Sequence, residues 1–318
     1  ETLQENWVKR FCRHISGDSG SLTATEEHII AYGNPDTERD GHLTLFNLKP
    51  ENGDIRWEFS VTGGLIYNCM PSIVDGMVVT CANWGAVFCL NLEDGSLVWQ
   101  AEPTGHFTTG HHSVAPNGLV YMVSHALDEK KWNCACSGGH GLLRAFDVHT
   151  GTMKWRRDFD LELQVTNAVI PRPGGGYILV APLGNNPGLP SPEAGGDHWE
   201  ARLAGLDADT GDELWSFTPP PLRFNSFPGN AARDVYLPDA WGSLTADGRG
   251  TVYGGFANGF MYAVDGHTGQ LLSQYDMKNA CNCACAIAPG MVVCTSALRV
   301  YCWRDEAAEA GWGASAAG

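Results

Sequence analysis

Short apolar runs alternate along the chain with turns rich in glycine, asparagine, aspartate and threonine. Typical runs are MVVTC at 77–81, YILVA at 177–181 and MVVCT at 291–295. Runs of this length between turn residues are typical of strands. None is long enough for a membrane-spanning helix. The pattern therefore predicts an all-β protein without a transmembrane segment of its own.

One phrase recurs along the chain and marks an internal repeat. It is aspartate, asparagine or threonine followed by glycine, three variable residues and tryptophan, as in DGSLVW at 94–99. Because glycine adopts the positive φ that a tight β-loop needs, the phrase predicts a hairpin whose return strand carries the tryptophan. The glycines of the five copies are Gly53, Gly95, Gly151, Gly211 and Gly269. The first four copies end in Trp57, Trp99, Trp155 and Trp215, and the fifth has Ser273 in place of the tryptophan.

Two more strand-sized runs precede each hairpin, so the repeat unit is predicted to be a four-stranded antiparallel blade. Its first two strands recur six times, which indicates a six-bladed β-propeller. The last unit runs out after its third strand, at 298–303. The N-terminal strand within 1–12 is expected to complete this blade and close the ring, because closure removes bare sheet edges. We expect one propeller domain over 1–306 and an Ala/Gly-rich tail over 307–318.

The Gly-x-x-x-Trp hairpin resembles the PQQ-like β-propeller repeat of quinoprotein alcohol dehydrogenases and of the outer-membrane assembly lipoprotein of the Bam complex. The resemblance extends from Trp7 to about Trp303. In that family the tryptophan packs between neighbouring blades, a role that the resemblance implies for Trp7, Trp57, Trp99, Trp155 and Trp215. The dehydrogenases bind PQQ and Ca²⁺, many of them against a disulfide between adjacent cysteines. This sequence has no Cys-Cys pair, so we expect no cofactor and keep PQQ with Ca²⁺ as the alternative.

The chain has 11 cysteines, an odd number, so they cannot all pair with one another. With a gap of one residue, three cysteines of the second unit align with three of the sixth, namely Cys69, Cys81 and Cys89 with Cys283, Cys294 and Cys302. Small buried side chains suit such positions. The alternative is a cross-strand disulfide in each unit, Cys81 with Cys89 and Cys294 with Cys302.

Two segments share the sequence Asn-Cys-Ala-Cys. Cysteines at alternate positions of a strand lie on one face, and thiolates with imidazoles bind Zn²⁺ or Cu(I). The usual Cys-x₂-Cys spacing is absent, so oxidised pairs, or a bridge between the two segments, are equally compatible with the pattern. The candidate metal ligands are Cys281, Cys283, Cys285, Cys134, Cys136, His111 and His112.

The net charge of −16 argues against binding a nucleic-acid backbone. The chain starts at Glu1 without a signal sequence, and we expect an extracytoplasmic protein whose targeting segment has been removed. No catalytic motif is present. The sequence thus favours a non-catalytic scaffold that binds other proteins, for example as an accessory subunit of a membrane complex. The segments expected to bind partners are the C-terminal tail and the insertions 126–141, 184–200 and 218–239. The alternatives are a quinoprotein-like oxidoreductase and a thiol-rich metal-binding propeller.

Overall fold

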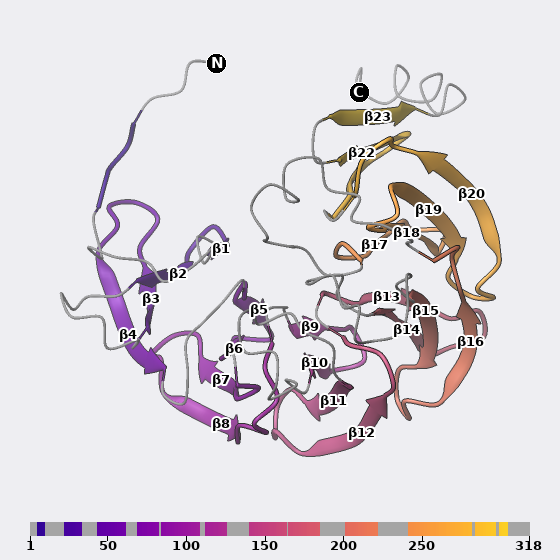
Figure 1. Cartoon of the computed structure of the whole chain (residues 1–318). Helices are drawn as coiled ribbons and strands as arrows, with labels where there is room; N and C mark the ends of the chain where they lie inside the picture. Colours follow the sequence, from indigo (N-terminus) through magenta and orange to yellow (C-terminus); the bar gives the residue numbers. More distant parts are fainter. Residues whose placement is uncertain are drawn as a thin grey trace, which may run out of the picture. The chain divides into compact units, whose positions relative to one another are not determined.

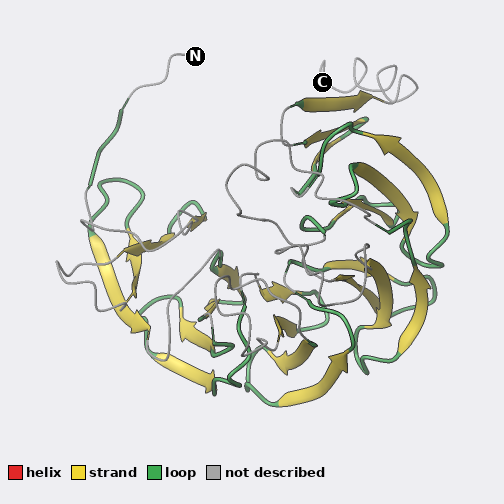
Figure 2. Cartoon of the chain, in the orientation of Figure 1, coloured by secondary structure: helices red, strands yellow, loops and turns green. Residues whose placement is uncertain are grey.

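The computed structural model describes residues 5–9, 22–33, 43–61, 69–82, 84–108, 112–125, 140–163, 165–184, 201–221, 241–281, 284–296 and 299–304. All regular secondary structure in these ranges is β-strand (Figure 2). The strands form six antiparallel sheets, five of four strands and one of three (Figure 1). Within the described ranges no helix is long and apolar enough to cross a membrane. The chain is therefore an all-β protein with the sheet architecture of a six-bladed β-propeller, as predicted.

Each sheet is built from strands that are consecutive in the chain. The first holds β1 (Leu22–Ala24), β2 (Ile29–Gly33), β3 (Leu43–Leu48) and β4 (Ile55–Val61), and the second β5 (Ser72–Val74), β6 (Met77–Cys81), β7 (Val87–Asn91) and β8 (Leu97–Ala101). The third holds β9 (His112–Val114), β10 (Leu119–His125), β11 (Gly141–Asp147) and β12 (Met153–Phe159), and the fourth β13 (Ala168–Pro171), β14 (Tyr177–Gly184), β15 (Ala201–Asp207) and β16 (Glu213–Phe217). The fifth holds β17 (Thr245–Ala246), β18 (Thr251–Gly255), β19 (Phe260–Asp265) and β20 (Leu271–Asp276), and the sixth β21 (Ala286–Ala288), β22 (Met291–Thr295) and β23 (Val300–Arg304).

The hairpins between the third and fourth strands share one turn geometry. In the second sheet the N–H of Gly95 donates to the carbonyl of Asn91 at 2.9 Å, and Gly95 has a φ of 71°. The register shifts by a β-bulge directly beside this turn, between Cys89 and Leu90. The same bonds and positive φ values recur at Gly53, Gly151, Gly211 and Gly269. The hairpins predicted from the repeated phrase are thus confirmed.

Four tryptophans lie against the turn glycine of a following hairpin. A Cβ added to Gly95 would lie 2.6 Å from the ring of Trp57, so only glycine leaves room for the indole. The Trp57 Nε1–H also donates to the carbonyl of Leu92 at 2.7 Å. Equivalent contacts join Trp7 to Gly53, Trp99 to Gly151 and Trp215 to Gly269. The repeated phrase therefore supplies both halves of a contact, the indole and the gap that receives it.

The chain divides into two compact units, one of residues Glu1–Ala126 and Leu142–Asp158, the other of Leu127–Gly141 and Phe159–Gly318. The middle strands of the first unit are buried on both faces, which explains why β6 reads as a continuous apolar run instead of alternating. In the second unit Trp241, Phe256 and Tyr262 are almost fully buried. The Trp241 ring lies tilted against Phe256 and edge-on against Tyr262.

Segment 5–9 has no strand assignment, and the sixth sheet has three strands in the described part of the chain. Trp7 nevertheless contacts Gly53, and its Nε1–H donates to the carbonyl of Pro50 at 2.7 Å. The pairing of segment 1–12 with the sixth sheet and the single domain over 1–306 stay predictions. The tail 307–318 lies outside the described residues.

Candidate functional site

Ser273 occupies the strand position that tryptophan holds in other sheets. It pairs with Ala263 across β19 and β20, next to the β-bulge of the fifth hairpin. At the same register position Trp57 pairs with Asn47, Trp99 with Cys89 and Trp215 with Gly205. The fifth sheet therefore lacks the indole that would project beyond its outermost strand.

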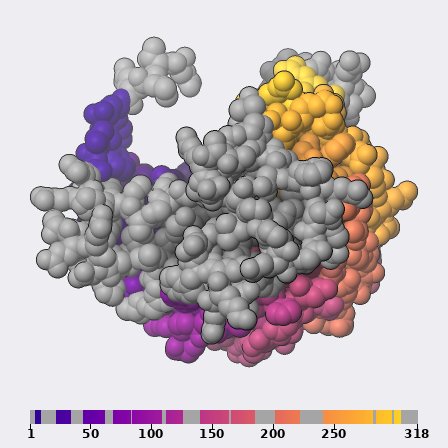
Figure 3. Space-filling model, viewed as in Figure 1, coloured from indigo at the N-terminus to yellow at the C-terminus, as the bar shows by residue number. Residues whose placement is uncertain are grey.

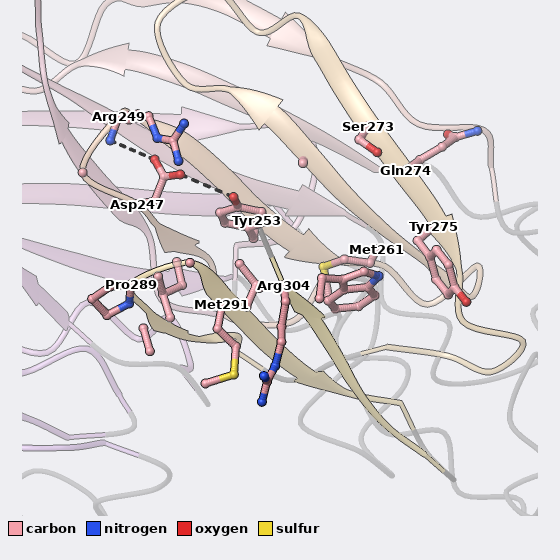
Figure 4. A pocket seen from close by; sticks show the side chains of 17 residues that line it. Asp247, Arg249, Tyr253, Met261, Ser273, Gln274, Tyr275, Pro289, Met291 and Arg304 are labelled. Atoms are coloured by element: carbon pink, nitrogen blue, oxygen red, sulfur yellow. Dashed lines mark hydrogen bonds between the residues drawn. The ribbon is translucent and has the colours of Figure 1, made fainter. Parts of the chain in front are cut away.

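A groove with a volume of about 690 Å³ lies beside Ser273 within the second unit. One wall comes from β18, β19 and β20 of the fifth sheet, and the other from β21, β22 and β23 of the sixth (Figure 4). Its lining is mainly apolar and includes Tyr253, Met261, Ala263, Met291 and Trp303. Ser273, at the position that tryptophan holds in other hairpins, is part of the lining, and the volume of the groove exceeds that of one indole side chain.

Polar groups lie around the edge of the groove. Asp247 accepts hydrogen bonds from the backbone N–H of Arg249 at 2.9 Å and from the Tyr253 hydroxyl at 3.4 Å (Figure 4). Burial, and then the charge of Asp247, raises the pKa of Tyr253, so its hydroxyl keeps its proton and stays a donor. Arg304 extends from β23 on the other wall. The groove thus combines an apolar lining with fixed donors and acceptors at its margin.

The strands that border the groove expose large apolar side chains. Leu272 is 53% exposed, Tyr275 48% and Val300 72%. The Tyr275 ring packs edge-on against Trp303 with centroids 5.5 Å apart, and the Trp303 ring stacks on Tyr301 at 5.8 Å. This part of the second unit forms the orange and yellow region of the space-filling view (Figure 3). An apolar groove beside exposed aromatic rings is typical of a binding surface.

Few ionisable side chains line the groove. Its described lining contains no histidine, cysteine or lysine, and Asp247 is its single carboxylate. The arrangement can hold an apolar or aromatic segment and orient it by hydrogen bonds at the margin.

The predicted metal ligands fall in different places. Cys281 and Cys285 lie in an apolar cluster of the second unit, where the Cys281 Sγ lies 3.6 Å from that of Cys294 and Cys285 contacts Met261. His112 lies in the first unit beside Cys69, 3.6 Å from Nδ1 to Sγ. Cys283, Cys134, Cys136 and His111 lie outside the described residues, as do most residues of the three predicted partner-binding insertions.

Neither alternative cross-strand pair lies directly opposite in the strand register. In the second sheet Cys81 pairs with Val87 and Cys89 with Val79, so the two thiols lie diagonally on one face. In the sixth sheet Cys294 pairs with Tyr301, and Cys302 with Val293, which sends their side chains to opposite faces. The structure forms no disulfide at any of these four cysteines. The one-residue gap lies after β6 and not before it, so Cys294 matches Thr80 instead of Cys81, whereas Cys302 still matches Cys89.

Cys89 and Cys302 hold the same register position but differ in burial, and we expect them to differ in reactivity. Burial raises the pKa of Cys89 to about 12, whereas Cys302 is exposed. Because the folded state holds a proton that the unfolded chain releases above about pH 8.5, the contribution of Cys89 to stability falls as pH rises towards 12. Iodoacetamide at pH 8.5 followed by peptide mass spectrometry should modify Cys302 first and Cys89 only after denaturation. Equal native rates would contradict the structure.

Sequence reasoning missed two features. It noted that Ser273 replaces tryptophan but did not infer the groove, although a missing large side chain at a repeated position was the signal. It also did not place His112 beside Cys69 and Cys81. Cys69 and Cys81 recur in the repeat alignment, and only the packing of neighbouring sheets shows that His112 joins them.

Comparison with known sequences gives one family and several distant relatives. The model of the family described as outer membrane protein assembly factor BamB matches residues 19–127 and 83–305. The dehydrogenase subunit of alcohol dehydrogenase (quinone) from Gluconobacter oxydans is 27% identical over 245 residues, which cover 70% of this chain and 30% of that protein. Quinohemoprotein alcohol dehydrogenase from Comamonas testosteroni is 22% identical over 183 residues, 56% of this chain and 22% of the relative. The chain thus spans less than a third of these relatives.

Solved structures with the same fold include members of both groups. BamB from Moraxella catarrhalis aligns with a TM-score of 0.58 and 17% identity, covering 94% of this chain and 75% of that one. Quinohemoprotein alcohol dehydrogenase ADHIIG from Pseudomonas putida aligns with a TM-score of 0.57 and 15% identity, covering 89% of this chain and 52% of that one. At these identities the alignments establish the fold.

Proposed function

Because the chain belongs to the family described as outer membrane protein assembly factor BamB, we propose that it is a non-catalytic β-propeller that binds another protein. It acts as a scaffold or accessory subunit of a larger, membrane-associated complex in an extracytoplasmic compartment. The family description, which refers to assembly at the outer membrane, supports this location and role.

The observation that carries the proposal is the groove beside Ser273. Other sheets fill the corresponding space with their own tryptophan, whose indole packs on a turn glycine and donates to a carbonyl, as Trp57 does with Gly95 and Leu92. Here that space is open and lined by Met261, Met291 and Trp303. We assign it to a segment of a partner protein that inserts an aromatic side chain, since buried aromatic anchors dominate the energy of protein interfaces.

The chain itself provides a probe for this groove. The peptide GSLVWQA copies residues 95–101, the return strand that carries Trp99. With 5-fluorotryptophan in place of the tryptophan, its binding is followed by ¹⁹F NMR on the full chain. We expect saturable binding, and none for the peptide with alanine in place of tryptophan.

Ser273→Trp should fill the groove and lower the affinity for the peptide by roughly tenfold or more, which corresponds to about 1.4 kcal/mol of binding free energy. The matched control is Leu272→Trp, which adds the same side chain to the neighbouring, exposed position of β20 and should leave the affinity unchanged. Equal binding by wild type and Ser273→Trp would overturn the proposal. Trp312 lies in the C-terminal tail. Peptide binding that appears only in the Trp312→Ala variant would also overturn the proposal, because the tail of the chain itself would then be the occupant of the groove.

The quinoprotein names of the relatives make an oxidoreductase the second candidate. A PQQ–Ca²⁺ pair needs several oxygen ligands for the ion, since Ca²⁺ binds six to eight oxygens. Within the described ranges, the group of three or more ligand-type side chains is Cys69, Cys81 and His112, a sulfur and nitrogen set unsuited to Ca²⁺. Within the described ranges no group of three or more carboxylates meets in this way, so we assign no site to this cofactor and derive no redox step from it.

A further inference from the structure

Three metal-ligand side chains meet inside the first unit, away from the groove. The Sγ of Cys69 lies 2.7 Å from the Sγ of Cys81 and 3.6 Å from the Nδ1 of His112. The three ligand atoms all lie within 4.8 Å of one another. Two sulfurs this close favour either a shared metal ion or oxidation to a disulfide.

The strand register explains why these residues meet. β5 and β6 pair with Ser72 opposite Val79, so Cys69, three residues before Ser72, lies close to Cys81 at the end of β6. His112 begins β9 of the neighbouring third sheet. All three side chains are buried, with exposed fractions of 1%, 1% and 4%. The cluster therefore joins two sheets in a space that excludes solvent.

A second layer of polar groups orients the cluster. The Nε2 of His112 lies 2.9 Å from the Ser72 hydroxyl, which leaves Nδ1 directed at the sulfurs. Metal-bound histidines usually have such a partner on the other ring nitrogen, because it fixes the ring and its tautomer. The Tyr32 hydroxyl is hydrogen-bonded to the Thr80 hydroxyl at 2.7 Å and interacts electrostatically with both thiols.

A buried cation completes the electrostatics. Arg144 is 4% exposed, donates to the carbonyls of Gly85 and Glu102, and interacts electrostatically with Cys81. A Cu(I) ion with two thiolates carries a net charge of −1, which Arg144 neutralises. A Zn²⁺ ion would leave the same buried site with a net charge of +1, and uncompensated buried charge is strongly unfavourable. Charge balance thus selects the monovalent ion.

The ligand number and type agree with this selection. Thiolates bind both Zn²⁺ and Cu(I), but structural Zn²⁺ sites are almost always four-coordinate, so a set of three ligands favours Cu(I). Trigonal coordination at roughly 2.3 Å from each sulfur requires the two sulfurs to move apart by about 1 Å. We infer that Cys69, Cys81 and His112 bind one Cu(I) ion as a buried S₂N site.

The test uses the reduced full chain under anaerobic conditions. Cu(I) is titrated in competition with bathocuproine disulfonate, because other thiols of the chain also bind copper and only the difference between variants is informative. Cys81→Ser should bind one equivalent less than wild type. Cys89→Ser is the matched control, because Cys89 is a buried thiol of the same sheet that contacts Met77 and the Val148 carbonyl instead, and it should lose nothing.

X-ray absorption on wild type loaded with one equivalent keeps the inference testable even if Cys81→Ser fails to fold. The spectrum should show three-coordinate Cu(I) with two sulfurs and one nitrogen, and His112→Asn should remove the nitrogen contribution. Unchanged stoichiometry in a folded Cys81→Ser, an all-sulfur spectrum, preferential binding of Zn²⁺, or a Cys69–Cys81 disulfide that persists under reductant would each overturn the site.

Discussion

Replacing Trp99 by alanine should lower the free energy of unfolding by roughly 3–5 kcal/mol, the usual loss for a buried tryptophan. Trp99 is 8% exposed, stacks on Phe146 with ring centroids 6.1 Å apart, and donates from Nε1 to the Val148 carbonyl at 2.7 Å. The truncation removes the packing and leaves that carbonyl without its indole donor. Urea unfolding followed by circular dichroism measures the loss.

Leu97 provides the control for Trp99. It lies on the same strand, β8, but is 47% exposed, so Leu97→Ala should change stability by no more than about 0.5 kcal/mol. Similar losses for the two substitutions would show that the Trp99 indole contributes no more to stability than a surface side chain, against the packing described above.

A second large effect is expected at the glycine that receives an indole. Gly95 and Gly118 have nearly the same backbone conformation, with φ values of 71° and 77°. A Cβ on Gly95 would lie 2.6 Å from the Trp57 ring, whereas a Cβ on Gly118 would meet nothing within 4 Å. The left-handed conformation costs alanine about 1–2 kcal/mol at either site. Displacing the indole adds about 1–3 kcal/mol at Gly95 only.

Gly118→Ala therefore measures the cost of the left-handed backbone alone. The difference in the free energy of unfolding between the two variants then measures the steric clash with Trp57. We expect Gly95→Ala to be the less stable variant in thermal and urea unfolding. The double variant Gly95→Ala with Trp57→Ala should recover part of the difference, since the added methyl then has room. Equal destabilisation at the two glycines would mean that the ring moves aside freely.

The repeat made most of the fold predictable. The glycine and tryptophan positions are local signals, because a positive φ and a hairpin are decided within a few residues, and they located five hairpins. The recurrence of the first two strands of each unit gave the sixfold repeat. The cysteine pairing was not predictable in the same way. A β-bulge or a one-residue shift changes which thiols face each other, as Cys294 and Cys302 show, and no sequence spacing reveals it.

The sites depend on contacts between sheets, which the sequence encodes less directly. The groove follows from what Ser273 lacks, and its lining comes from two sheets that are consecutive in the chain. The Cys69, Cys81 and His112 cluster joins residues up to 43 positions apart, since His112 reaches across from the next sheet. Both become visible only when neighbouring sheets are packed together.

The indole–glycine contacts also determine how unfolding can spread. Each one couples a sheet to the next hairpin, so within a unit the loss of one sheet weakens its neighbour, as in a one-dimensional array with nearest-neighbour coupling. Ser273 provides no indole for such a contact between the fifth and sixth sheets. We therefore expect the last three described strands to open at a lower free energy than the rest of the second unit, so that the groove proposed to accept a partner would also be the place where local unfolding begins.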